Sequence, residues 1–362
     1  MRTSLCDELG IEHPVFGFTP SEHVAAAISR AGGLGVLGCV RFNDAEDLDR
    51  ALTWMDENTD GKPYGVDIVM PATVPKEGTQ IDLASLIPQS HKEFVQQTLL
   101  KLGVPPLPDG EGGEGVLGWL HSVARSHVDV ALAHPIRLIA NALGSPPTDV
   151  IEQVHAAGVP VAALAGKAEH ARRHVANGVD IVVAQGYEAG GHTGEVATMV
   201  LVPEIVDAVD VPVLAAGGIG SGRQAAAAMA LGASGVWMGS YWLTTAEYTL
   251  GNSSTQQALL AAGSSDTVRT RIYTGKPARL LKTRWTEAWT SAEAPDPLPM
   301  PLQNILVSEA HLRIARSDDP SVVSMPVGQV VGRMNEVRPV AEVLEDLLAE
   351  FDATVERLTK LR

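Results

Sequence analysis

The stretch DIVVAQGYEAGGHTG, residues 180–194, decides how this 362-residue chain is interpreted. It starts with an apolar run, residues 180–184, that is typical of a buried strand. The run ends in a glycine-rich loop that holds one histidine, His192. Glycines let a backbone approach a ligand closely, and histidine is the side chain best suited to proton transfer near neutral pH. A strand that delivers His192 into such a loop predicts a catalytic platform.

A second stretch, PVLAAGGIGSGRQAAAAMALGASGVWMGS (residues 212–240), repeats the order strand, glycine turn, helix, strand. Ser221 and Gln224 have the spacing of a capping box, and Gly232 is a suitable residue to end the helix. The last apolar run, residues 235–238, ends in another glycine turn. Backbone N–H groups and a helix N-terminus would then face one point, which predicts a phosphate-binding cup. Two ordinary tight turns are the alternative.

The same alternation extends through the first half of the chain. Helices are expected at residues 22–31, 43–58, 148–157 and 169–177, and strand-like apolar runs occur at 14–16, 34–38, 63–70, 137–140 and 160–164. Short strands separated by helices indicate an α/β protein with a parallel sheet. Ligand loops at several strand ends favour a TIM (β/α)8 barrel over a doubly wound sheet.

The alternation breaks twice, which suggests three parts. Residues 1–70 and 135–285 are expected to form the barrel, and the proline- and glycine-rich residues 71–134 a lid or cap, or a disordered insertion. Residues 286–362 form a C-terminal extension whose amphipathic helix, near 340–358, should dock on the barrel. A basic cluster could meet coenzyme A phosphates or form ordinary surface ion pairs. It comprises Arg269, Arg271, Lys276, Arg279, Lys282 and Arg284.

Composition narrows the function classes. The net charge of −16 argues against nucleic acid or an anionic membrane as the main partner. The two cysteines, Cys6 and Cys39, exclude a disulfide framework and a cysteine-rich metal site, and no histidine pair has a metal-binding spacing. No run reaches the roughly 18 apolar residues of a membrane helix, and no signal peptide is recognisable. We therefore expect a cytoplasmic protein.

The motifs resemble the signature of the nitronate monooxygenase family, formerly called 2-nitropropane dioxygenases. The resemblance rests on residues 185–194, 215–219 and 232–240, extends to 29–38 and 63–67, and covers most of residues 1–245. It implies a TIM barrel that binds FMN non-covalently. It also implies an enzyme that oxidises alkyl nitronates or nitroalkanes, with O2 as electron acceptor.

The resemblance also implies roles for individual residues. His192 matches the family's catalytic base. The implied FMN-binding residues are Gly17, Phe18, Asp67, Gln185, Gly190, Gly191, Gly217, Gly218, Trp237, Met238, Gly239 and Ser240. Among these, Asp67 would lie near the isoalloxazine ring, and Gly218 with residues 237–240 would hold the phosphate. The chain departs from the family pattern at residues 17–19, usually Ala-Pro-Met, at Asp67, usually Asn, and at Trp237, commonly Gln.

Alternatives remain open for the reaction. The histidine loop is similar in flavin-type enoyl-acyl-carrier-protein reductases and in flavin oxidoreductases that act on acyl-CoA thioesters. An acyl thioester is therefore the second candidate substrate, with FMN retained. A barrel that binds a phosphorylated metabolite without redox chemistry would need only the phosphate cup. The expected partner is a small molecule, and a homodimer is compatible with the sequence.

Overall fold

The computed structural model describes residues 1–70, 83–108 and 120–361. Residues 71–82 and 109–119, which include the glycine-rich centre of the expected insertion, lie outside the described residues. In the described part of the chain, no helix has the length and apolar composition that crossing a membrane requires.

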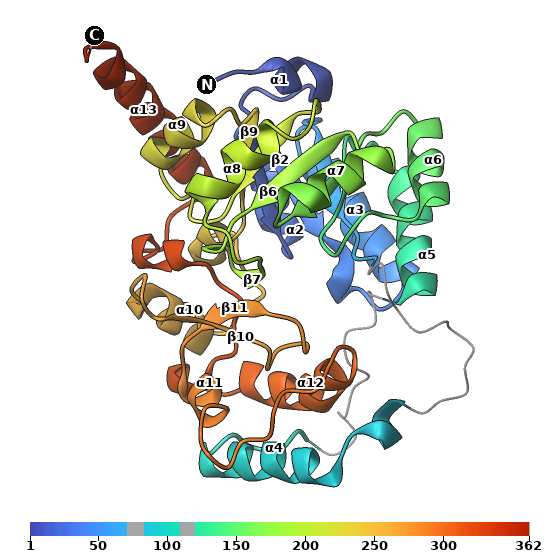
Figure 1. Ribbon diagram of the computed structural model, residues 1–362, viewed down its shortest axis with the longest axis vertical. Helices are drawn as coiled ribbons and strands as arrows, with labels where there is room; N and C mark the ends of the chain where they lie inside the picture. The colour runs from blue at the N-terminus through green and yellow to red at the C-terminus, as the bar shows by residue number, and fades with distance from the viewer. Residues whose placement is uncertain (71–82, 109–119, 362) are drawn as a thin grey trace.

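Eight parallel strands close into a barrel, which confirms the predicted TIM-barrel fold (Figure 1). The closure is made by β9, which pairs back onto β1 with Val236 opposite Val15. Each strand overlaps an apolar run expected from the sequence. In barrel order the strands are β1 (Val15–Thr19), β2 (Leu34–Gly38), β3 (Tyr64–Asp67), β4 (Ile139–Asn141), β5 (Val161–Ala165), β6 (Ile181–Gln185), β8 (Val213–Ala216) and β9 (Gly235–Met238).

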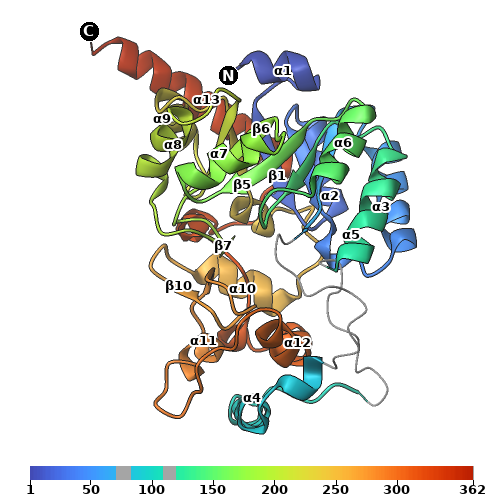
Figure 2. The same cartoon turned by 45° about the vertical axis from the view of Figure 1, so that its right-hand side comes forward.

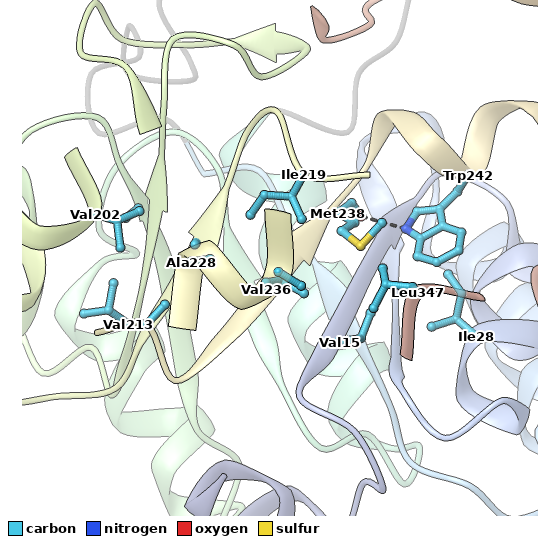
Figure 3. Packing of buried hydrophobic residues seen from close by; sticks show 14 of the residues in the cluster. Val15, Ile28, Val202, Val213, Ile219, Ala228, Val236, Met238, Trp242 and Leu347 are labelled. Atoms are coloured by element: carbon cyan, nitrogen blue, oxygen red, sulfur yellow. Dashed lines mark hydrogen bonds between the residues drawn. The ribbon is translucent and has the colours of Figure 1, made fainter. Parts of the chain in front are cut away.

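Eight helices surround these strands. They are α2 (Glu22–Arg30), α3 (Ala45–Asn58), α5 (His121–Leu132), α6 (Thr148–Ala156), α7 (Ala168–Ala176), α8 (Thr198–Val206), α9 (Gly222–Ala230) and α13 (Val340–Thr359). The eighth, α13, returns from the far end of the chain to pack against α9 and α2. Leu344 and Leu347 of α13 join the same core as Val15 and Trp242, and Figure 3 shows Leu347 beside Ile28. The short helix α1 (Ser4–Leu9) adds Leu5 to the core of the barrel interior.

Side chains alternate between the interior of the barrel and the helical layer, as the two-residue period of a strand requires. Phe16 and Trp237 belong to the interior core, whereas their neighbours Val15 and Met238 pack toward the helices. The same alternation turns Gln185, the last residue of β6, toward the barrel mouth. The carboxyl ends of the strands therefore bring polar side chains to one rim.

A second layer adjoins the barrel (Figure 2). We define it as α4 (Gln89–Lys101), α10 (Ser253–Ala261), β10 (Thr267–Thr270), β11 (Ala278–Leu281), α11 (Arg284–Ala288) and α12 (Leu302–Ala315). Its apolar core brings Leu99 of α4 together with Trp285 and Val307. The strands β10 and β11 form a three-stranded sheet with β7 (Gly191–His192), which belongs to the loop after β6. This sheet connects the second layer to the predicted catalytic loop.

The parts differ from those expected from the sequence. The last barrel strand ends at Met238, and residues 267–281 form an antiparallel hairpin outside the barrel, although the barrel was expected to reach residue 285. The predicted docking of the C-terminal amphipathic helix on the barrel is confirmed, because α13 lies in the helical layer. In contrast, α5, which was expected in the insertion, packs beside α3 of the barrel. Short apolar segments do not reveal their pairing direction or partner, so the sequence could not separate the two layers.

Candidate functional site

His192 lies where the barrel meets the second layer. Its strand β7 pairs with β11, with His192 opposite Ala278. The imidazole Nδ1 is 3.3 Å from the carbonyl oxygen of Pro277, and Nε2 is 3.3 Å from Thr274 Oγ1. Because a carbonyl only accepts, Nδ1 carries the proton and Nε2 presents its lone pair. Burial lowers the pKa of His192 from its ordinary value of 6.5, so the imidazole is neutral at pH 7. This is the form that a general base requires.

Asp67 ends β3 and is buried, with 1% of its surface exposed. Its Oδ2 has no hydrogen-bond partner among the described residues. Burial raises the pKa of this carboxyl to about 7. An unpartnered buried carboxyl oxygen is costly, and such groups concentrate at functional sites. These properties make Asp67 a candidate contact for a bound molecule.

Three features of the glycine turn after β8 are compatible with the predicted phosphate cup. Gly217 and Gly218 have φ of 96° and 72°, a region that side chains disfavour. Ser221 Oγ accepts from Gln224 N at the start of α9, as the capping pattern predicts. The amide groups of residues 218–219 and 239–240 donate no hydrogen bond to another described residue. These N–H groups, at the ends of adjacent strands, are available to an anion.

Ser240 lies beside this turn at the end of β9. Its Oγ accepts a 2.8 Å hydrogen bond from Gly328 N, which leaves the hydroxyl proton able to donate. A Cβ at Gly239 would meet nothing closer than Phe18 Cδ1, at 3.6 Å. Both residues are half-buried at the rim, and a Cβ at Gly239 would make ordinary contact with Phe18, in keeping with a role in binding.

Three of the residues predicted to contact FMN pack away from the rim. The indole of Trp237 fills the barrel interior, stacked on Phe16 and Phe18 with ring centroids 6.3 and 6.2 Å apart. Met238 packs toward the helices, where its carbonyl accepts from Trp242 Nε1 (Figure 3). A Cβ at Gly17 would overlap Ile28. For Gly17, Trp237 and Met238, packing explains the residue type, and any contact with a ligand would come from the backbone.

The histidine loop itself is tightly held. Gly190 approaches the chain at Gly328 so closely that a Cβ would lie 2.6 Å from its nitrogen, whereas Gly191, with φ of 72°, faces open space. Glu188 Oε2 accepts from Thr198 N and Thr198 Oγ1, at 2.9 and 2.8 Å, which caps the start of α8. Glycine at position 190 thus reflects backbone packing.

Several residues of the site were not expected from the sequence. Thr274 and Pro277 hold the imidazole of His192 from the second layer. Gly328 and Gln329 reach the loop from about 140 positions further along the chain, and Gln329 N donates to Glu188 O at 2.9 Å. The only local signal for them is a proline-bounded loop containing a glycine, residues 326–329, which is common in loops of any function.

Comparison with known proteins shows the family to which the chain is related. The sequence pattern of the family described as nitronate monooxygenase matches residues 2–350. Over 375 residues the chain is 50% identical to a Mycobacterium tuberculosis protein named "Putative monooxygenase Rv1533", covering 100% of this chain and 99% of that protein. A hydroxy-methyl-oxo-octahydroindene-carboxyl-CoA dehydrogenase of Rhodococcus jostii is 34% identical over 78% of this chain and 66% of that protein.

A solved structure shares the fold across nearly the whole chain. Nitroalkane oxidase from Streptomyces ansochromogenes superimposes with a TM-score of 0.82 and 27% identity, covering 98% of this chain and 100% of that one. The match in sequence pattern spans both the histidine loop and the glycine turns described above. The chain belongs to the nitronate monooxygenase family of flavin-dependent oxidoreductases.

Proposed function

We propose that this protein is an FMN-dependent oxidoreductase that oxidises alkyl nitronates or nitroalkanes, with O2 as electron acceptor. The observation that carries the proposal is His192, a neutral imidazole held beside the barrel. Among the described residues, Thr274 is the one hydrogen-bond partner of its Nε2 atom. A base of this kind can remove the acidic proton next to a nitro group.

The residues at the rim fit FMN. The amides of residues 218–219 and 239–240, with the hydroxyl of Ser240, would hold its phosphate. The unpartnered Oδ2 of Asp67 and the amide of Gln185 would meet polar atoms of the isoalloxazine ring. When bound, FMN supplies the two-electron redox chemistry that amino-acid side chains lack.

The chain's own residues supply proton transfer and orientation. Nδ1 of His192 is fixed by Pro277 O, so Nε2 is the atom that accepts the substrate proton. Thr274 Oγ1, which donates to Nε2 at 3.3 Å, would turn away when substrate enters. Transfer of the proton leaves an imidazolium and a nitronate anion, which together conserve charge.

The first test replaces the base. His192→Ala should lower kcat/KM for neutral nitroethane by about 10²–10⁴-fold, the usual contribution of a general base. For preformed ethyl nitronate, which no longer needs deprotonation, kcat/KM should fall much less. Flavin absorbance of the purified variant checks that the cofactor is retained. Equal turnover of nitroethane by the variant and the wild type would refute the role of His192.

A second candidate substrate is an acyl-CoA thioester. It is supported by the name of the Rhodococcus jostii relative and by the positive charge of Lys276 beside His192. Guanidinium and ammonium groups are the usual protein partners of coenzyme A phosphates. Anaerobic titration decides between the candidates: propyl-2-nitronate should bleach the flavin under the first, and an acyl-CoA should perturb its spectrum under the second.

A further inference from the structure

Arg279, in β11, contacts the start of the histidine loop. Its guanidinium donates to the carbonyl oxygen of Tyr187 from Nε and Nη2, at 3.1 and 2.9 Å. Nη1 donates to Thr267 Oγ1 at 3.0 Å, and the guanidinium carbon lies 4.4 Å above the Tyr187 ring. Hydrogen bonding and the cation–π contact together fix both the carbonyl and the ring of Tyr187.

Arg269, in β10, reaches the other end of the loop. The register of the hairpin places Arg269 directly opposite Arg279. Its Nη2 lies 3.4 Å from the carbonyl oxygen of Thr193, the residue after His192. The guanidinium carbon is 5.9 Å from the Tyr187 ring, and Glu195, which is largely exposed, approaches to 3.8 Å. The two arginines therefore hold carbonyls on both sides of His192.

The facing pair of arginines has an electrostatic cost. Like charges directly opposite across two strands destabilise the pair. Arg279 is only 2% exposed, and among the described residues no carboxylate forms an ion pair with it. A buried cation requires compensation, which here comes chiefly from the loop carbonyl and the tyrosine ring. The Nε atom of Arg269 is buried without a partner in the described part of the chain.

We infer that Arg279, assisted by Arg269, is a positioning residue that holds the His192 loop in place from the second layer. Between these two arginine–carbonyl contacts, the ladder of β7 and β11 pairs Gly191 with Arg279 and His192 with Ala278. Loss of these contacts would increase the mobility of the loop while leaving the barrel strands intact. Its consequence for turnover rests on the proposed role of His192, because proton transfer requires a base held within hydrogen-bonding reach.

Hydrogen exchange tests these contacts without reference to activity. In the purified, flavin-loaded protein, Arg279→Met should speed amide exchange of residues 186–194 by about ten-fold or more, since a charge-assisted hydrogen bond is lost. The exchange rates in Arg279→Lys, which keeps the charge, should fall between those of Arg279→Met and the wild type. Arg284→Met is the matched control: Arg284 belongs to the same basic cluster but pairs with Asp319 at 3.5 Å. Unchanged exchange in Arg279→Met would overturn the inference.

Kinetics test the consequence for His192. Arg279→Met should lower kcat for nitroethane by about ten-fold or more with little change in KM, because an interaction that orients the base is removed. Arg279→Lys should restore part of kcat for nitroethane, and kcat for ethyl nitronate should be much less affected by either substitution. Wild-type kcat despite faster loop exchange would overturn the positioning role. If instead His192→Ala is fully active, the proposed function fails while the exchange result still tests the contacts of Arg279.

Should Arg279→Met fail to fold, Arg269→Met replaces it. The Arg269 side chain is about one-fifth exposed, so its removal leaves no large buried cavity. Faster exchange around Thr193 in this variant supports the inference, and unchanged exchange opposes it.

Discussion

At the residue scale, His192 is defined by two contacts that the sequence does not display. Pro277 O fixes the proton on Nδ1, and Thr274 Oγ1 faces Nε2. A histidine in a glycine-rich loop is a general indication of proton chemistry, whereas these contacts determine which nitrogen acts. The direction of the His192 pKa shift then gives a testable pH dependence.

The pH profile should show one acid limb. Burial lowers the pKa of His192 below 6.5, so the neutral form of the base predominates at neutral pH. For nitroethane, the ratio of kcat/KM in the wild type to kcat/KM in His192→Ala should fall as protonation of His192 begins, at a midpoint below 6.5, because the titration of Asp67 is common to both proteins. His192→Ala should lack this limb. A midpoint of the ratio at or above neutrality would contradict the assignment.

Asp67 makes a prediction about stability. Its pKa is raised to about 7 in the folded protein, compared with about 3.9 in an unfolded chain. Between these values the folded state holds a proton that the unfolded state has released, so the free energy of unfolding falls as pH rises through this window. Above about pH 7 the effect is constant.

Asp67→Asn should remove this dependence of the free energy of unfolding on pH. Between pH 4.5 and pH 8, the free energy of unfolding of the variant should rise by about 2–4 kcal/mol relative to that of the wild type, at about 1.4 kcal/mol per pKa unit. Urea denaturation of both proteins at these two pH values, with equal flavin content, provides the measurement. A parallel pH dependence in the two proteins would show that Asp67 is not the titrating group.

At the element scale, close packing of α9 on α13 depends on Gly222. This glycine is the first residue of α9, and a Cβ there would overlap the carbonyl oxygen of Leu347 and the nitrogen of Phe351. Both clashing atoms belong to backbone, which cannot move as a side-chain end can. The approach of the two helices therefore sets the residue type.

Gly222→Ala should destabilise the protein although alanine is the better helix former. We expect a loss of about 1–3 kcal/mol, the usual cost of overpacking. The control is Ala227→Ser, on the exposed face of the same helix, which should stay within about 0.5 kcal/mol. Thermal unfolding measures both, and a Gly222→Ala protein as stable as the wild type would mean that the helices can separate without cost.

At the scale of the whole molecule, segments distant in sequence build each layer together. Arg313 of α12 donates to the carbonyls of Val104 and Pro105 at 2.9 and 2.8 Å, which ties the insertion after β3 to the segment after β9. The barrel is completed only when α13 returns to the place between α9 and α2. The second layer is thus formed by two excursions from a single barrel.

The return of α13 predicts that its buried face stabilises the whole barrel. Leu344→Ala should cost about 2–5 kcal/mol, because this side chain is 1% exposed within the core that also contains β1 and β8 residues. Leu358→Ala, in the same helix but 43% exposed, should change the free energy of unfolding by less than about 0.5 kcal/mol. Equal effects of the two substitutions would show that the docked face of α13 contributes little.

The sequence by itself determined the eight strand positions, the histidine loop and the glycine turn that opens α9, because each depends on residues within a few positions of one another. Strand period, capping and positive φ are local properties. Only the tertiary structure decided that residues 267–281 pair with His192 and that Asp67 Oδ2 is left without a partner among the described residues. It also decided that α13, whose docking on the barrel the sequence predicted, packs against α9 and α2. These features depend on which residues tens to hundreds of positions apart come together, and apolar burial is non-directional, so the local pattern does not specify the partner.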